Sequence, residues 1–130
     1  MLCTIHSLEN TKYTIQTKSN GLVAGSEIVY NNSNGNNAEQ FIIKNNKIIS
    51  AISNLALEVK GSMQPDSKII LSKVKDTDNQ KFYFRKDGTI RTANGLCISI
   101  PNKSSLNTPL ILSPANGKNS QTWVLNTNLA

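Results

Sequence analysis

Residues 121–123 read Gln-Thr-Trp, and two earlier triplets follow the same pattern: Gln-Lys-Phe at 80–82 and Glu-Gln-Phe at 39–41. The triplets begin at positions 39, 80 and 121, so both steps are 41 residues long. Large apolar residues occupy alternate positions in Phe-Tyr-Phe at 82–84 and in Trp-Val-Leu at 123–125. Such alternation is typical of strands with one buried face. Equal spacing of the triplets indicates an internal repeat.

The same offset aligns other segments. Ser-Glu-Ile-Val-Tyr at 26–30 aligns with Ser-Lys-Ile-Ile-Leu at 67–71 and with Thr-Pro-Leu-Ile-Leu at 108–112. Leu-Ala-Leu-Glu-Val at 55–59 aligns with Leu-Cys-Ile-Ser-Ile at 96–100. Because one offset satisfies several independent segments, the repeat is a strong signal.

The first copy fits less well at its start. Tyr-Thr-Ile-Gln-Thr at 13–17 aligns with 55–59 only if about one residue is inserted in the following loop. We therefore expect a single domain over 1–130, built from units at about 2–44, 45–85 and 86–126. One unit is too small to bury its own apolar face, so the three must fold together.

Each unit contains four short strand candidates, which in the third unit are 89–92, 96–100, 109–112 and 122–125. No window shows the apolar spacing of an amphipathic helix, so helix should be scarce. Asn-Gly pairs tolerate positive φ and predict tight hairpin turns. Such pairs lie at 20–21, 34–35, 94–95 and 116–117. The pattern predicts an all-β fold, a closed barrel capped by hairpins with pseudo-threefold symmetry.

Composition narrows the class of protein. Hydrophobic residues make up 38% of the 130-residue chain and charged residues 17%, which predicts a globular domain. The N-terminus shows no signal peptide, and no apolar run is long enough to span a membrane, so the compartment stays open. The net charge is +6, but the basic residues are scattered, which favours a solvated surface over a nucleic-acid interface.

Catalytic and metal sites are not expected. His6 is the single histidine, and no cysteine and histidine cluster has the spacing of a zinc site. No nucleophile elbow is present. Glu58, Asp66, Asp76 and Asp78 lie in one unit, and we interpret them as solvated charges and not as the paired carboxylates of a glycosidase. No enzyme and no cofactor are predicted.

The repeated triplet resembles the Gln-x-Trp signature of ricin-B-type (R-type) lectin domains, which have the β-trefoil fold. The triplet is intact at 121–123, has Phe for Trp at 80–82 and is eroded at 39–41. The stretch 82–98, which runs from Phe-Tyr-Phe-Arg-Lys to Asn-Gly-Leu-Cys-Ile, is similar to the family's link between units. The resemblance covers essentially the whole chain and implies that Phe41, Phe82 and Trp123 lie in one central core.

The resemblance also implies a sugar site on the surface of each unit, made by an acid, an asparagine before the signature glutamine, and a stacking aromatic. The second unit matches best, with Glu58 at the acid position and Asn79-Gln80 as the amide pair. We predict these three as carbohydrate-binding residues, with Lys60 and Asp78 at the rim.

The other units depart from the family pattern. Ser99 and Ser120 occupy the acid and asparagine positions in the third unit, and Gln16 and Ala38 occupy them in the first. The stacking positions hold Asn31, Ser72 and Ser113. Single-unit affinity should therefore be low, and useful binding would need several units or copies acting together, or a different ligand geometry.

The cysteines also depart from the family pattern. The intra-unit disulfide of the family would join Cys97 to position 115, which holds alanine. Cys97 is therefore expected to be a buried free thiol. Cys3 has no evident partner in the sequence.

The resemblance implies a non-enzymatic carbohydrate-binding module with glycans or glycoproteins as partners. Galactose or N-acetylgalactosamine is the family's commonest preference. The domain would be part of a larger protein or a homo-oligomer, with no nucleic acid and no membrane insertion. Two alternatives stay open: a trefoil that has lost its sugar sites and serves protein interaction or targeting, and electrostatic binding to acidic lipids or sulfated glycans.

Overall fold

The computed structural model describes residues 1–18 and 23–128, and within them the chain is all-β. The strands are short, and several of the turns between them contain residues with positive φ, such as Asn45, Asn46, Gly88 and Gly95. They are β1 Leu2–Ser7, β2 Tyr13–Thr17, β3 Ile28–Asn32, β4 Phe41–Lys44, β5 Lys47–Ser50, β6 Ala56–Val59, β7 Ile69–Ser72, β8 Tyr83–Phe84, β9 Ile90–Arg91, β10 Cys97–Ser99, β11 Ile111–Ser113 and β12 Trp123–Asn126.

Short 3-10 helices precede the three signature aromatics. They are η2 Asn37–Glu39, η3 Asp78–Gln80 and η4 Asn119–Gln121. Each ends on the first residue of a signature triplet, so the buried Glu39, Gln80 and Gln121 hold equivalent places in the three units.

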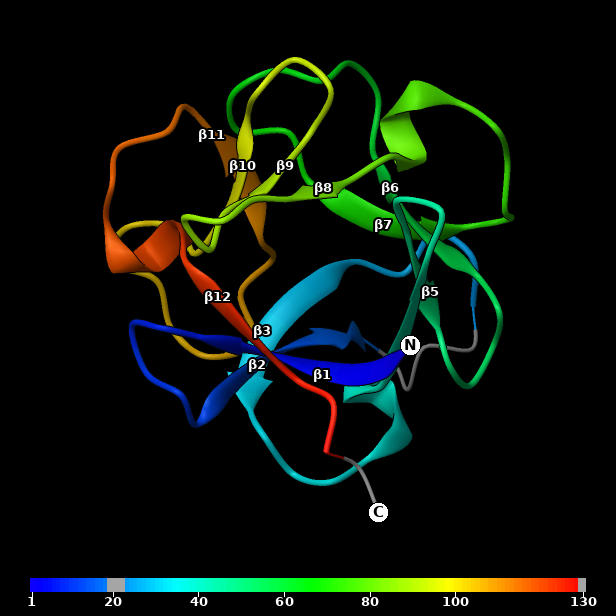
Figure 1. Cartoon of the computed structure of the whole chain (residues 1–130), viewed down its shortest axis with the longest axis horizontal. Helices are drawn as coiled ribbons and strands as arrows, with labels where there is room; N and C mark the ends of the chain where they lie inside the picture. Colours follow the sequence, from blue (N-terminus) through cyan, green and yellow to red (C-terminus); the bar gives the residue numbers. More distant parts are fainter. Residues whose placement is uncertain (19–22, 129–130) are drawn as a thin grey trace.

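The strands pair into a closed ring in the order β12–β1–β4–β5–β8–β9. Figure 1 shows where β12 and β1, the last and first strands, meet. Antiparallel ladders make most of these joins, and β1 pairs with both β4 and β12. Two joins rest on single backbone bonds, from Phe82 N–H to Asn46 O at 2.7 Å and from Trp123 N–H to Gly88 O at 2.8 Å. Closure leaves few unpaired strand edges.

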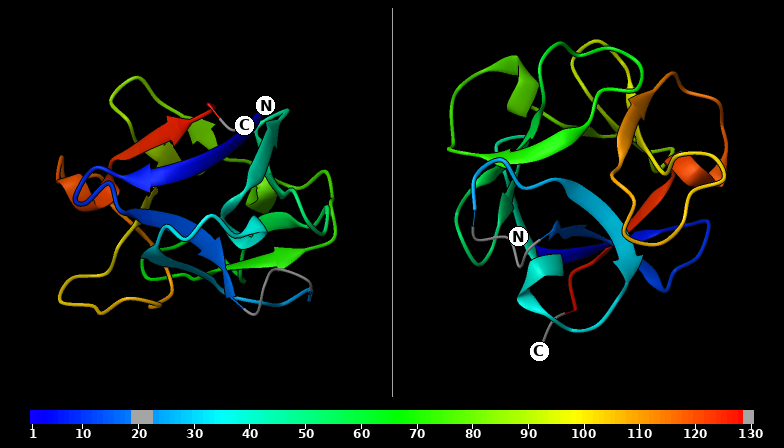
Figure 2. Two further views of the ribbon diagram at one scale, coloured as in Figure 1. Left: turned by 90° about the horizontal axis from the view of Figure 1, so that it is seen from below. Right: turned by 180° about the vertical axis from the view of Figure 1, so that it is seen from behind.

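The remaining hairpins β2–β3, β6–β7 and β10–β11 cap one end of this ring, as the right-hand view of Figure 2 shows. They contact one another cyclically through isolated bridges. The bridged pairs are Glu27 with Ile70, Lys68 with Ile111, and Pro109 with Val29. Glu27, Lys68 and Pro109 are equivalent positions of the three units, and so are Val29, Ile70 and Ile111. The same contact between neighbouring units is therefore made three times, which is the threefold symmetry expected of the cap. The predicted β-trefoil is confirmed.

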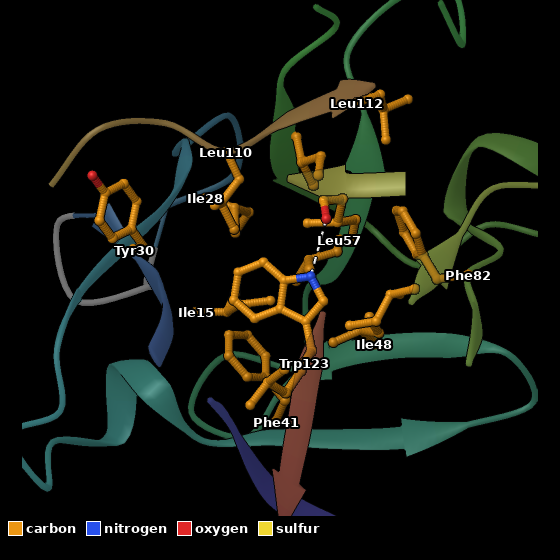
Figure 3. Close-up of a cluster of buried hydrophobic side chains, with 14 of the residues drawn as sticks. Ile15, Ile28, Tyr30, Phe41, Ile48, Leu57, Phe82, Leu110, Leu112 and Trp123 are labelled. Carbon is orange, nitrogen blue, oxygen red and sulfur yellow. Dashed lines mark hydrogen bonds between the residues drawn. The ribbon is translucent and has the colours of Figure 1, made fainter. Parts of the chain in front are cut away.

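The signature aromatics meet in one core. Phe41 and Phe82 are fully buried and Trp123 is 5% exposed, and all three belong to the same apolar cluster (Figure 3). Trp123 also donates its indole N–H to Ile98 O at 3.0 Å. Burying a ring of this size stabilises the fold by about 2–3 kcal/mol.

Three of the third-unit strand predictions are confirmed by β9, β10 and β12. The fourth strand, expected at 109–112, occurs two residues later as β11. Pro109 has no N–H for a ladder hydrogen bond and contributes only the isolated bridge to Val29. Cys3 and Cys97 are both buried and free, as expected for Cys97.

The Asn-Gly predictions had mixed outcomes. The pair at 94–95 forms the turn of the β9–β10 hairpin, with Gly95 at φ 86 and a Gly95 N–H bond to Thr92 O. The pairs at 34–35 and 116–117 also have positive-φ glycines, but the hairpin prediction for them is wrong. The strands on either side of each pair have other partners, so these turns shape the loops that lead into η2 and η4. The pair at 20–21 lies outside the described residues.

Candidate carbohydrate-binding site

Gln80 clamps the loop that precedes η3 in the second unit. Its side chain is fully buried, and its Nε2 donates to Lys73 O at 2.7 Å and to Glu58 Oε1 at 3.0 Å. Its Oε1 accepts the Lys75 backbone N–H at 2.8 Å. The amide thus satisfies two backbone groups that would otherwise be left unpaired inside the loop.

The third unit repeats the clamp. Gln121 donates to Pro114 O at 2.7 Å and accepts the Asn116 N–H at 2.9 Å. It also donates to the hydroxyl of Ser113 at 2.7 Å, which is hydrogen-bonded to Ser99. Ser99 Oγ in turn donates to Cys97 O at 3.1 Å. The acid position of this unit is therefore part of a neutral, internally satisfied chain of hydrogen bonds.

In the first unit the equivalent loop is held by a carboxylate, Glu39, at the position of Gln80. Glu39 accepts the Ser33 hydroxyl at 2.6 Å and the Asn34 N–H at 2.8 Å. A carboxylate cannot donate to a carbonyl, and here Gln16 supplies that bond, from Nε2 to Asn32 O at 2.8 Å. Carboxylate and amide have changed places relative to Glu58 and Gln80. The strand register supports this equivalence, since Gln16 lies opposite Val29 and Glu58 opposite Ile70.

The predicted site residues divide into two groups. Glu58 and Gln80 are in contact, and Asn79 lies beside them, with its Nδ2 donating to Val59 O at 3.4 Å and its Oδ1 accepting the Thr77 hydroxyl at 2.6 Å. Asp78 is exposed, and its nearest cation is Lys81 Nζ at 3.4 Å. Lys60 is exposed at the end of β6 and forms no ion pair within the described residues.

Sequence reasoning missed Lys75. Its ammonium lies 3.0 Å from Glu58 Oε1, while the Glu58 side chain is only 10% exposed. The same carboxylate oxygen accepts from Gln80. Lys75 lies on the clamped loop, so its approach to β6 depends on the loop conformation, and no sequence signal marks it. The acid position of the second unit carries an ion pair.

A cleft of about 950 Å³ lies between the third unit and the first. Its lining includes Ser99, Ser113 and residues 101–104 of the third unit and Tyr13 and Tyr30 of the first, with Asp66 from the second unit. Figure 1 shows the β1–β2 connection and the β10–β11 connection on the same side of the molecule, beside η4. The family resemblance placed Ser99, Ser113 and Ser120 at the acid, stacking and asparagine positions of the third-unit sugar site, and all three line this cleft. It did not include Tyr13 or Tyr30, which belong to the first unit and are distant in the chain.

In the described part of the chain, clearly shifted pKa values occur at two cysteines and one aspartate. Burial raises the pKa of the Cys3 thiol to about 11 and also raises the pKa of Cys97. Hydrogen bonds from Thr89, and then Arg91, lower the pKa of the exposed Asp87. None of these groups belongs to the second-unit site. Across 1–18 and 23–128, no cluster of three potential metal ligands occurs, and no helix is long and apolar enough to cross a membrane.

The comparisons with known proteins point to one family and one fold. The family model described as the ricin-type beta-trefoil lectin domain matches residues 2–123. The search of curated proteins finds no match. Solved structures match well in shape but share little sequence.

The C-terminal half of an earthworm R-type lectin, solved in complex with GalNAc, has 12% identity and a TM-score of 0.81, over 95% of this chain and 96% of that chain. The designed threefold-symmetric protein ThreeFoil has 18% identity and a TM-score of 0.84, over 95% and 96% of the two chains.

A mosquitocidal holotoxin has 19% identity and a TM-score of 0.84 over 99% of this chain, which spans only 17% of the toxin. The chain likewise spans 46% of the Abrus precatorius agglutinin chain, at 15% identity and a TM-score of 0.81 over 96% of its own length. At these identities the likeness shows the fold alone.

Proposed function

Because the chain belongs to the family of ricin-type β-trefoil lectin domains, which are carbohydrate-binding modules, we propose that its second unit binds galactose-type sugars at a shallow surface site. Glu58 and Asn79 are the proposed contact residues. Gln80 is fully buried with its amide bonded inside the protein, so in this proposal it orients Glu58 and does not touch the sugar. Lys60 and Asp78 stay as proposed rim residues, since both are exposed.

The observation that carries the proposal is the oriented carboxylate of Glu58. Hydroxyl groups of a sugar donate hydrogen bonds most strongly to a charged acceptor. Gln80 holds Oε1 at 3.0 Å, so the carboxylate loses little conformational freedom when a ligand binds. The neighbouring Asn79 amide adds donor and acceptor groups on the same face.

Lys75 sets the expected strength of this site. Its ammonium shares Glu58 Oε1 with Gln80, so a sugar must either bind the remaining lone pairs or draw Lys75 aside. A millimolar site has about 4 kcal/mol of binding free energy. The absence of an aromatic ring at Ser72 removes about 1 kcal/mol of stacking. We therefore expect weak binding at a single site.

Weak single sites are useful when several act together. We propose that this domain works either within a larger protein or as a homo-oligomer. Its small share of the holotoxin and agglutinin chains supports the first arrangement, since those proteins contain the fold as one part.

The sugar proposed is galactose or N-acetylgalactosamine. The earthworm lectin half was solved with GalNAc, and a Momordica charantia homologue of type II ribosome-inactivating proteins was solved with α-methyl-D-galactoside. These ligands belong to proteins with 12% and 16% identity to this chain, so they support the choice of the first sugars to test.

A glycan array with the chain displayed multivalently tests the proposal. Glycans ending in galactose or GalNAc should bind, and Glu58→Gln should weaken binding about tenfold because a neutral amide is the poorer acceptor. Glu27→Gln is the matched control, since Glu27 pairs with Lys18 and Lys68 in the cap and not with the site. If no glycan binds above background, or if both variants bind like the unmodified chain, the proposed site is wrong.

A second candidate function is a protein-interaction or targeting domain with degenerate sugar sites. The residues Asn31, Ser72 and Ser113 at the stacking positions favour it, since none supplies an aromatic face. The ion pair of Glu58 with Lys75 also favours it, because an acid with a partner of its own needs no ligand. A stable protein partner whose capture is unaffected by excess galactose and GalNAc would support this candidate.

A further inference from the structure

Two hairpin turns, 44–47 and 85–88, lie at the end of the barrel opposite the cap hairpins, and we call this end the base. The left-hand view of Figure 2 shows them at the top, in teal and yellow-green, with the cap hairpins below. The first turn begins and ends with lysine, and the second begins with Arg85 and Lys86. Lys44 and Arg85 occupy equivalent positions, three residues after the signature aromatics of their units. The base is therefore basic at two equivalent places.

The base holds most of the net charge of the chain. The turn 44–47 contains two cations and no acid, and the segment 85–91 contains three cations and one acid, Asp87. Together they carry +4 of the net charge of +6, while the rest of the chain has nine cations and seven acids. Asp87 is bonded to Arg91 at 3.0 Å, so this acid does not neutralise the four cations of the two turns.

The cations of the two turns also lack acidic partners. Within the described part of the chain, none of the four forms an ion pair. In the cap, by contrast, Lys18 and Lys68 both pair with Glu27. In the second unit, Lys75 and Lys81 pair with acids of the same unit. Those cations are balanced locally, and the cations of the base are not.

Lys44 and Lys47 form a pair of like charges. They lie directly opposite each other at the end of the β4–β5 hairpin, and like charges at opposite positions are destabilising. The two residues between them, Asn45 and Asn46, both have positive φ, at 53 and 61, as in a tight two-residue hairpin turn. This turn fixes the register, so the two ammonium groups cannot be separated by a shift of one strand. An anionic partner over the turn would relieve their repulsion.

We propose that the base adsorbs to a membrane surface that contains anionic lipids, with the cations of the two turns against the headgroups. Figure 1 shows the β4–β5 turn and the β8–β9 turn apart from each other around the barrel. A continuous layer of headgroups reaches both turns at once, which a single small anion does not. Each basic residue near such a surface strengthens binding about fivefold. The contact is electrostatic, goes beyond the proposed function and requires no sugar.

The test is co-sedimentation of the full chain with two kinds of vesicle, phosphatidylcholine alone and phosphatidylcholine with phosphatidylserine. Only the vesicles with phosphatidylserine should bind. Binding should fall about tenfold or more between about 50 mM and about 500 mM salt, because salt screens exposed charges. Lys44→Gln combined with Lys47→Gln should weaken binding about 25-fold, about fivefold for each charge, and so should Arg85→Gln combined with Lys86→Gln. Thermal unfolding should show that the Lys44 and Lys47 variant is no less stable, since a repulsion is removed.

Lys103→Gln combined with Lys118→Gln is the matched control, since it removes the same charge from two exposed lysines that line the cleft. Vesicle binding of this control should change by less than about threefold. If the control weakens binding as much as the Lys44 and Lys47 variant, or if the chain binds heparin but neither kind of vesicle, the proposal is wrong. Because the vesicles carry no sugar, these outcomes leave the glycan-array test of Glu58 unaffected.

Discussion

Glu58 and Gln80 in the second unit have the same structural role as Gln16 and Glu39 in the first, because each pair includes the side chains that bond the backbone of the loop before the signature aromatic. In each unit a loop before the signature aromatic turns its backbone polar groups inward, and one buried carboxamide must donate to a carbonyl there. The amide can occupy either of the two positions, as Gln16 does in the first unit and Gln80 in the second. The carboxylate that remains is buried at Glu39, a residue that is 3% exposed. At Glu58 the side chain is 10% exposed, and its carboxylate contacts Lys75.

Gln80→Ala should destabilise the domain more than Asn79→Ala. The first change leaves Lys73 O and Lys75 N–H without their partner inside a loop, at a cost of about 1–3 kcal/mol. Asn79 is half-buried, and its bond to Val59 O is long at 3.4 Å, so its loss should cost less. Urea unfolding followed by the fluorescence of Trp123 measures both. If the two variants lost the same free energy of unfolding, the role of Gln80 in holding this loop would be contradicted.

Asp87 gives the domain a small acid-sensitive contribution. Hydrogen bonds from Thr89 to its carboxylate, and then the contact with Arg91, hold the pKa of Asp87 below its ordinary value. A lowered folded-state pKa stabilises the fold above the unfolded pKa, and this stabilisation is lost as pH falls through the folded pKa. Asp87→Asn should therefore lower stability at pH 7 and flatten its decrease below pH 4.

Melting temperatures across pH 2.5–7 measure this effect. Because Asp87 is exposed, the difference between the two proteins should be modest. Asp76→Asn is the control, since that carboxylate is 94% exposed and lies 3.9 Å from its nearest cation. Parallel pH curves for all three proteins would contradict the prediction.

At the scale of elements, the fold depends on where β12 begins. Trp123 N–H bonds to Gly88 O in the turn before β9, which joins the last strand to the third-unit turn. Gly88 has φ +87, and a Cβ built there would lie 2.6 Å from Thr122 Cγ2. This turn can approach β12 closely only because residue 88 has no side chain.

Gly88→Ala should cost more than Gly61→Ala. Both glycines have positive φ, at +87 and +73, so both changes bear the backbone strain of about 1 kcal/mol. Only at Gly88 does the new methyl group meet another side chain, since nothing lies within 4 Å of a Cβ at Gly61. Thermal unfolding should show a melting temperature several degrees lower for the Gly88 variant. Equal melting temperatures would show that Thr122 moves aside freely.

At the scale of the whole molecule, the three units hold one another in a cycle. In the cap, Leu71 N–H bonds to Ser26 O, Leu112 N–H to Ser67 O, and Tyr30 N–H to Thr108 O. The first and last strands are also joined, since β1 pairs with β12 from Thr4 opposite Asn126 to Ser7 opposite Trp123. The left-hand view of Figure 2 shows these two strands side by side. No unit buries its apolar face alone.

We therefore predict one cooperative unfolding transition, with the same midpoint for three probes: the Cys3 thiol, the Cys97 thiol and the fluorescence of Trp123. Cys3 lies in β1 and Cys97 in β10, and both are buried with raised pKa values, so neither should react with a thiol reagent in the folded state at pH 8. In single-cysteine variants, both thiols should become reactive at the urea midpoint given by Trp123 fluorescence. Separate midpoints would show that the units unfold independently.

The sequence alone predicted most of the fold. The equal spacing of Phe41, Phe82 and Trp123 and the short alternating strands are local or periodic properties, which a chain records directly in its order of residues. The resemblance pointed to Glu58, Asn79 and Gln80, and the structure places the Glu58 and Gln80 side chains in contact and bonds Asn79 to the backbone of Val59. It could not indicate that Gln80 is fully buried, because burial depends on how the loop folds over β6.

Only the tertiary structure decided the contacts between loops and between units. Lys75 approaches Glu58 because the loop that carries it is closed around Gln80. Tyr13 shares a cleft with residues 101–104 because ring closure places the first unit beside the third. These positions are distant in the chain and follow no period, so their contacts depend on packing that no local pattern of residues specifies.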